Sequence, residues 1–128
     1  MNTELNSILC GQGVSLVTPF NSAGEVDFPS LEKLVNRCIS GDADYLLTLG
    51  PSSECSLLNI EEQNRILEFV VEINNGVKPL IAGISSSDTR SAVQRIATMS
   101  MTHVSGVFCA ASNPVASSQS GHIGHFRS

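Results

Sequence analysis

The sequence contains no tryptophan, a single tyrosine, and only seven lysine and arginine residues among 128. Twelve acidic residues give a net charge of −5, and the few positive side chains form no cluster, so we expect neither a nucleic acid nor an anionic membrane as a partner. No apolar run approaches the ~20 residues of a membrane-spanning helix. The stretch from Met1 to Cys10 has no basic segment ahead of an apolar one, which argues against a signal peptide and for a cytoplasmic protein.

The cysteines and histidines show no spacing typical of a metal site, and we expect neither a metal nor a cofactor. Cys38 and Cys109 fall within apolar patterns and are predicted to be buried thiols. Cys55 lies in a loop, where it is either reactive or inert, and no histidine is near it in the sequence. The three histidines are expected at the surface or at strand edges; they are His103, His122 and His125.

Hydrophobic residues make up 41% of the chain and charged residues 15%, which is the composition of one globular domain with a real core. Short apolar runs predict four strands, at residues 14–17, 45–49, 79–83 and 104–110. Between them, helical spacing predicts three helices, and the chain reaches Ser128 about one turn into a fourth.

Capping residues mark where these helices begin. Asp27 is the predicted N-cap of the first, which ends at Gly41. Asn59 and Glu62 predict a variant of the capping box for a helix reaching about Asn74, and the third helix starts at Ser87 or Asp88. The predicted inward faces are Phe28, Leu31, Leu34, Val35, Cys38 and Ile39 in the first helix, Ile66, Leu67, Val70 and Val71 in the second, and Ala92, Val93, Ile96 and Ala97 in the third.

Strands that alternate with helices predict an α/β fold with a parallel sheet. Two architectures fit this alternation: a small, complete doubly wound domain, and the N-terminal half of a (β/α)8 barrel, which takes about 250 residues when whole. We expect residues 1–128 to form a single domain in either case.

The loop after the second predicted strand is the candidate binding site. The apolar run Leu46–Leu49 ends at Gly50, and small residues and a carboxylate follow it. Small residues let the backbone approach a ligand, and free N–H groups in such a turn bind a carboxylate or phosphate. We therefore take Gly50, Ser52 and Ser53 as candidate substrate-binding residues. The alternative is a plain strand-to-helix connection.

Several motifs in order resemble one family. They are Gly-Val-Ser-Leu-Val-Thr-Pro-Phe at 13–20, Gly-Glu-Val-Asp at 24–27, the loop 50–56 with Glu61-Glu62 behind it, and Pro-Leu-Ile-Ala-Gly at 79–83 followed by Thr89-Arg90. Together they resemble the dihydrodipicolinate synthase and N-acetylneuraminate lyase family of Schiff-base aldolases, with the synthase branch of lysine biosynthesis closer. The resemblance runs from about Gly11 to Phe126 and favours the half-barrel, truncated after its fourth strand.

The resemblance implies an oligomeric lyase that joins pyruvate to an aldehyde through a lysine Schiff base. In that family the loop Gly-Thr-Thr-Gly-Glu holds the pyruvate carboxylate, and its first threonine relays protons between two tyrosines. Here Gly50 is kept, Pro51 stands at the relay threonine, and Ser52 stands at the second threonine. Ser53 replaces the second glycine, at a cost if that position needs a positive φ. Glu54 is kept, and we expect it to anchor the loop by a hydrogen bond to backbone; the alternative is a general base.

The other catalytic positions of the family are not matched. Ser112-Asn113-Pro114 aligns with the family's Pro-Tyr-Tyr motif, and the lone Tyr45 begins a strand at the wrong end. Lys33 and Lys78 lie away from the expected pocket, so we assign no catalytic residue and predict that this chain alone is inactive. The alternatives are a truncated non-catalytic paralogue and a binding module, one that holds a small pyruvate-like carboxylate or pairs with a full-length homologue. The uncovered edges of a half-barrel also predict self-association.

Overall fold

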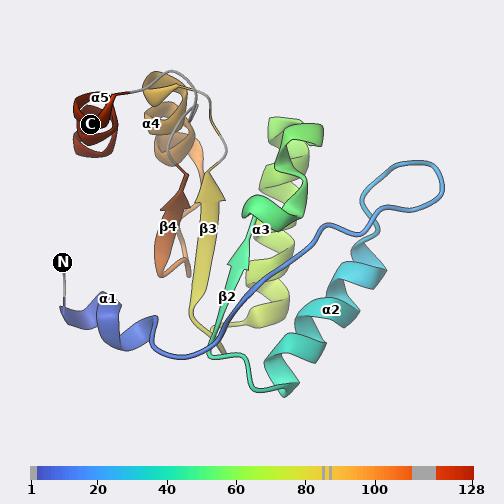
Figure 1. Ribbon diagram of the computed structural model, residues 1–128. Coiled ribbons are helices and arrows are strands. Elements are labelled where there is room, and N and C mark those ends of the chain that lie inside the picture. The colour runs from blue at the N-terminus through green and yellow to red at the C-terminus, as the bar shows by residue number, and fades with distance from the viewer. Residues whose placement is uncertain (1–2, 85, 87, 111–117) are drawn as a thin grey trace.

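The computed structural model describes residues 3–84, 86, 88–110 and 118–128 (Figure 1). The strands are β1 (Gly13–Ser15), β2 (Tyr45–Thr48), β3 (Leu80–Ile84) and β4 (Gly106–Cys109). The α-helices are α1 (Thr3–Ile8), α2 (Phe28–Ser40), α3 (Ile60–Asn74), α4 (Thr89–Thr98) and α5 (Gln119–Arg127). Two short 3₁₀ turns, η1 (Pro51–Ser53) and η2 (Cys55–Leu57), form the loop between β2 and α3.

The strands are parallel, and they lie side by side in chain order, β1-β2-β3-β4. A doubly wound sheet would reverse its strand order at a switch point, whereas a barrel adds each new strand at the same edge. The observed order therefore confirms the half-barrel and excludes the doubly wound alternative.

The two faces of the sheet differ in what covers them. The register aligns Val14, Leu46 and Leu80 on one face, and these side chains join the core formed with α2 and α3. Leu47 and Ile81 align on the opposite face, which we call the lumen face because it corresponds to the inside of a barrel. Ile81 is buried there but does not belong to the main core. The core therefore fills only the space between sheet and helices.

The predicted helix starts are confirmed, each by hydrogen bonds. The Asp27 carboxylate accepts from the backbone N–H three residues on (3.0 Å), and Asp88 caps α4 in the same way (2.9 Å). At α3 the capping box is complete: Glu62 N–H donates to Asn59 Oδ1 (2.9 Å), and Asn59 N–H donates to the Glu62 carboxylate (2.8 Å). Gly41 ends α2 as predicted. Local sequence rules thus fix where the helices begin.

The inward face of α4 was predicted wrongly. Ala92 is buried as expected, but Arg95 and Met99 share its stripe. The expected inward side chains that are instead exposed are Val93, Ile96 and Ala97. Residues 92, 95 and 99 follow an i, i+3, i+7 stripe, which is the narrow contact that a helix makes when it packs along one side only.

The other differences between the sequence predictions and the structure are smaller. Helix α1 was not predicted, and α5 runs for nine residues rather than one turn. Cys38 and Cys109 are half-buried rather than buried, and so is Val71 of α3. Among the described residues, no helix is long and apolar enough to cross a membrane.

Candidate functional site

The loop after β2 is pressed tightly against β3. Leu49 is 2% exposed and takes a left-handed conformation with φ of 55°. A Cβ on Gly83 would lie 2.5 Å from the Leu49 carbonyl carbon and 2.8 Å from Gly50 N, and closer still to the Leu49 oxygen. Glycine at position 83 therefore allows the loop backbone to cross the end of β3.

Ser53 is part of the internal structure of this loop. Its side chain is 2% exposed, and its hydroxyl lies 2.6 Å from the Gly50 carbonyl oxygen and 2.8 Å from Cys55 Sγ. Thr18 Oγ1 donates to the Ser53 carbonyl (2.7 Å) and ties the loop to the segment after β1. The Ser53 hydroxyl therefore holds the loop together and faces away from solvent.

The residues with positive φ in this loop do not include Ser53. Ser53 has no positive φ, so its replacement of a glycine costs nothing in backbone conformation. The left-handed residues of this loop are Leu49 and Glu54, each with φ of 55°. Glu54 is exposed, and within the described residues its carboxylate accepts no hydrogen bond, so the expected anchoring role was wrong.

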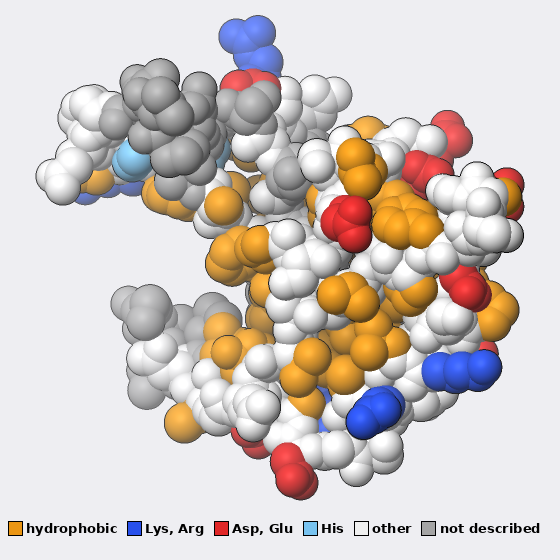
Figure 2. All heavy atoms as spheres, turned by 45° about the vertical axis from the view of Figure 1, so that its right-hand side comes forward, with side chains coloured by type: hydrophobic (Ala, Val, Ile, Leu, Met, Phe, Trp, Pro, Cys, Tyr) orange, Lys and Arg blue, Asp and Glu red, His pale blue; other side chains and the backbone are white. Residues whose placement is uncertain are grey.

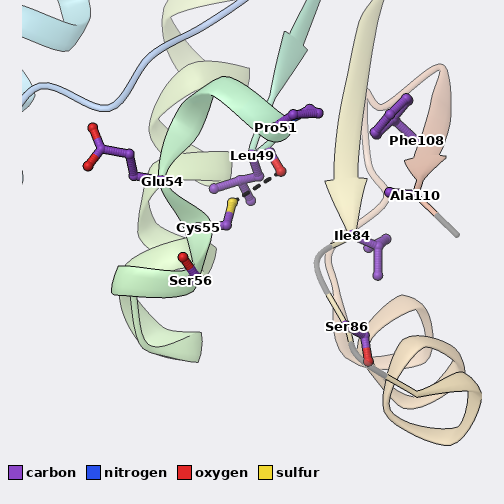
Figure 3. A pocket seen from close by; sticks show the side chains of 10 residues that line it. Leu49, Pro51, Glu54, Cys55, Ser56, Ile84, Ser86, Phe108 and Ala110 are labelled. Carbon is purple, nitrogen blue, oxygen red and sulfur yellow. Dashed lines mark hydrogen bonds between the residues drawn. The ribbon is translucent and has the colours of Figure 1, made fainter. Parts of the chain in front are cut away.

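A cavity of about 210 Å³ opens between this loop and the carboxyl ends of β3 and β4 (Figure 3). Gly50 and Pro51 line one side, and Ile84, Phe108 and Ala110 face them from across the gap. Of the predicted binding residues only Gly50 lines it, since Ser53 points inward and the exposed Ser52 lies outside its lining. Among the described lining residues the only charged side chain is that of Glu54.

Cys55 is a buried thiol rather than an exposed nucleophile. It is 6% exposed, and its Sγ donates to the Leu49 carbonyl (3.1 Å), as Figure 3 shows. Burial raises the pKa of Cys55, and this outweighs the hydrogen bond with Ser53 and the nearby charge of Arg95, both of which lower the pKa. The thiol form therefore dominates at neutral pH.

Arg95 is the buried charge that the sequence reading missed. It is 6% exposed, and its Nη1 donates to Asn64 Oδ1 (2.6 Å). Its Nε and Nη2 are also buried, and they have no hydrogen-bond partner among the described residues. Burial lowers the pKa of Arg95. Arg95 lies three residues after Ala92 and four before Met99, and this helical spacing is the sequence feature that agrees with its place on the buried stripe of α4.

The C-terminal helix is attached through His125. Its Nδ1 lies 2.7 Å from Thr89 Oγ1, and its Nε2 lies 3.7 Å from Cys109 Sγ, so the ring links α5 to α4 and β4. His125 and His122 are half-buried, whereas His103 is exposed as predicted. Within the described part of the chain, no three His, Cys, Asp or Glu side chains gather as metal ligands.

The remaining candidates for chemistry lie away from the cavity. Lys33 is exposed on α2, and Lys78 precedes β3, where its backbone bonds to the Asn74 side chain. Tyr45 begins β2, and its ring occupies the space where a Gly13 side chain would be. The segment Ser112-Asn113-Pro114 lies outside the described residues.

Comparison with known proteins agrees with this architecture. A model of the dihydrodipicolinate synthetase family matches residues 9–128. The 4-hydroxy-tetrahydrodipicolinate synthase of Flavobacterium psychrophilum is 33% identical over 117 residues, which are 91% of this chain and 40% of that protein. The corresponding synthase of Porphyromonas gingivalis is 36% identical over 119 residues, covering 93% of this chain and 40% of its own length.

Solved structures give the same result. Dihydrodipicolinate synthase from Aquifex aeolicus superimposes with a TM-score of 0.82 at 30% identity, covering 91% of this chain and 39% of that one. The structure from Bacillus clausii, 23% identical, shares the fold with a TM-score of 0.87 over 96% of this chain and 42% of its own. The chain thus spans about 40% of the length of the relatives that it matches. With its four parallel strands in barrel order, it belongs to the dihydrodipicolinate synthetase family.

Proposed function

We propose that these 128 residues form a non-catalytic half of a pyruvate-aldolase barrel, one that retains a weak site for a small carboxylate such as pyruvate. The observation that supports this most is the cavity beside Gly50, which has a loop backbone on one side and no amine among its described lining residues. In such chemistry a lysine must attack the keto carbon to form the Schiff base. Lys33 and Lys78 are positioned elsewhere on the fold.

The loop backbone supports binding. The N–H group of Gly50, which lines the cavity and lies outside the helices and strands, has no acceptor among the described residues, whereas that of Ser53 donates to the Gly50 carbonyl (3.1 Å). Free N–H groups in a turn are suitable donors to a carboxylate. Pro51 contributes no N–H group and no hydroxyl, so both the proton relay and one donor are missing at that position.

Electrostatics keep the affinity low. Glu54 places a negative charge at the cavity, and the whole chain carries a net charge of −5. A backbone N–H donor in an open site then competes with a repulsive carboxylate. We expect a dissociation constant for pyruvate of about 1 mM or weaker. The four thiols, all free in the structure, suit a reducing cytoplasm.

Titration with pyruvate, followed through backbone amide resonances, tests the binding. We expect saturable shifts at Gly50 and Glu54, which line the cavity, and none with acetone, which has the keto group but no carboxylate. Glu54→Gln removes the opposing charge and is expected to tighten binding several-fold, while Glu61→Gln, at the exposed start of α3, serves as the matched control. Equal shifts with acetone, or none with pyruvate, contradict the proposed site. Pyruvate consumption with an aldehyde present is expected to equal the buffer blank.

A further inference from the structure

Apolar side chains are exposed around the free edge of β4. They come from β4 itself and from the two helices beside it, and we call them the β4-edge patch: Val93 (44% exposed), Ile96 (39%), Val107 (36%), Phe108 (38%), Ile123 (53%) and Phe126 (58%). Figure 2 shows hydrophobic side chains around a deep hollow between the C-terminal helix and the N-terminal end of the molecule. Val107 and Phe108 are neighbours in β4 and point to opposite faces of the sheet, so the exposed apolar side chains flank the edge on both faces.

Both edges of the sheet are also open. Within the described residues, β1 pairs only with β2, and β4 pairs only with β3. Open parallel edges are templates for further strands. A half-turn about an axis parallel to the strands keeps the strand direction, so it brings β1 of a second copy alongside β4 as a parallel neighbour. Two such pairings close a ring of about eight strands, the number at which a parallel barrel fills its own interior.

The exposed area matches the size of such an interface. The chain has an accessible surface of 7916 Å². A compact monomer of its 13.6 kDa mass is expected to expose only about 6,600 Å². The excess is about 1,300 Å² per chain, or about 2,600 Å² for a pair, which is in the range of obligate dimer interfaces.

From the edges, the patch and the area together, we propose that two copies of this chain associate about a two-fold axis parallel to their strands. Each β4 pairs with the β1 of the other copy, and the lumen faces meet inside a closed barrel. A barrel closed in this way has no lysine at its carboxyl end from either copy, so it remains without the Schiff-base amine.

The mass of the 128-residue chain in solution is the first test. Light scattering after size-exclusion chromatography and sedimentation velocity are expected to give a single species of about 27 kDa, twice the 13.6 kDa of one chain. A compact monomer at tens of micromolar overturns the proposal. So does an open series of larger aggregates, because a closed two-fold pair has no edge left to extend.

Hydrogen exchange identifies the surface that pairs. We expect the amides of β1 (Gly13–Ser15) and β4 (Gly106–Cys109) to become protected together as concentration rises. A dimer held through α4 and α5 alone would leave β1 unprotected, and that result also overturns the proposal.

Two matched substitutions complete the test. Val107→Asp places a charge at the β4 edge, whereas Val77→Asp places the same charge at a position 59% exposed between α3 and β3. We expect Val107→Asp to raise the dimer dissociation constant about 100-fold, because a charge in an apolar interface is desolvated without a partner. Val77→Asp is expected to leave it unchanged. Phe108→Asp is the second edge variant, and far-ultraviolet circular dichroism checks that each variant is folded. A folded Val107→Asp and a folded Phe108→Asp that both dimerise like the parent protein contradict the proposal.

Discussion

Replacement of Gly83 by alanine is expected to weaken the fold at the point where the sheet meets the candidate site. The new Cβ would lie 2.5 Å from the Leu49 carbonyl carbon and 2.8 Å from Gly50 N. Carbon and nitrogen atoms that are not bonded prefer roughly 3.5 Å or more, so the loop has to retreat by about 1 Å. Neither neighbour is a flexible side chain, and β3 is buried along its whole length. The clash can therefore be relieved only if the backbone moves.

The expected loss of stability is about 3 kcal/mol, the upper part of the range for overpacking in a core. Leu49 already occupies a left-handed conformation, and its carbonyl accepts the Cys55 thiol, so moving it also breaks that hydrogen bond. A loss of this size lowers the melting temperature by about 10 °C in a domain of this length. Urea unfolding, followed by circular dichroism at a fixed protein concentration, measures it.

Gly124→Ala is the matched control. Gly124 lies inside α5, and a Cβ there meets no atom of another segment within 4 Å among the described residues. Alanine in the interior of a helix is expected to stabilise it by about 0.5–1 kcal/mol relative to glycine. The two substitutions add the same methyl group with opposite expected signs. A Gly83→Ala protein within about 0.5 kcal/mol of the parent would refute the close contact on which the loop geometry depends.

Three further predictions concern the caps and the buried thiol. Asn59→Ala removes the capping box of α3 and is expected to cost about 1 kcal/mol, seen as a lower urea midpoint with an unchanged slope. The pKa values of Asp27 and Asp88 are lowered, chiefly by hydrogen bonds from the serine three residues on, so their stabilisation is present above the ordinary value of 3.8 and is lost as pH falls through the lower folded values. Melting curves between pH 5 and pH 2 measure this loss, and replacing both aspartates by asparagine is expected to reduce it; an equally steep loss would count against it. Iodoacetamide is expected to modify Cys55 far more slowly than the exposed Cys10 in the native protein and equally fast in urea; equal native rates, read by peptide mass spectrometry, would show that Cys55 is not buried.

Local chemistry explains what the sequence predicts well. The capping box joins Asn59 and Glu62, which are three residues apart. Because its side-chain and backbone groups are so close in the sequence, it can be predicted without knowledge of the tertiary structure. The ends of β2 and β3 follow from apolar runs that stop at Gly50 and Gly83 or close by. Chain order and the family motifs then give the half-barrel, because successive parallel strands of this kind add at one edge.

Tertiary contacts decide the rest. The buried stripe of α4 depends on which of its sides meets β3, and Val93 and Ile96 fit an inward face equally well by spacing alone. The sequence predicts that Ser53 contacts a ligand, but the path of the loop turns its hydroxyl toward the Gly50 carbonyl. That path depends on the positive φ of Leu49, and nothing about a leucine in a sequence indicates such a conformation.

The proposal that this half of the barrel lacks the reacting amine has one most direct test. The chain is incubated with pyruvate and borohydride, which reduces any Schiff base to a stable adduct, and its intact mass is then measured. Propionate in place of pyruvate gives the background. We predict the same mass in both samples, because Lys33 and Lys78 lie away from the cavity. A pyruvate-dependent adduct mapped to either lysine would contradict the account.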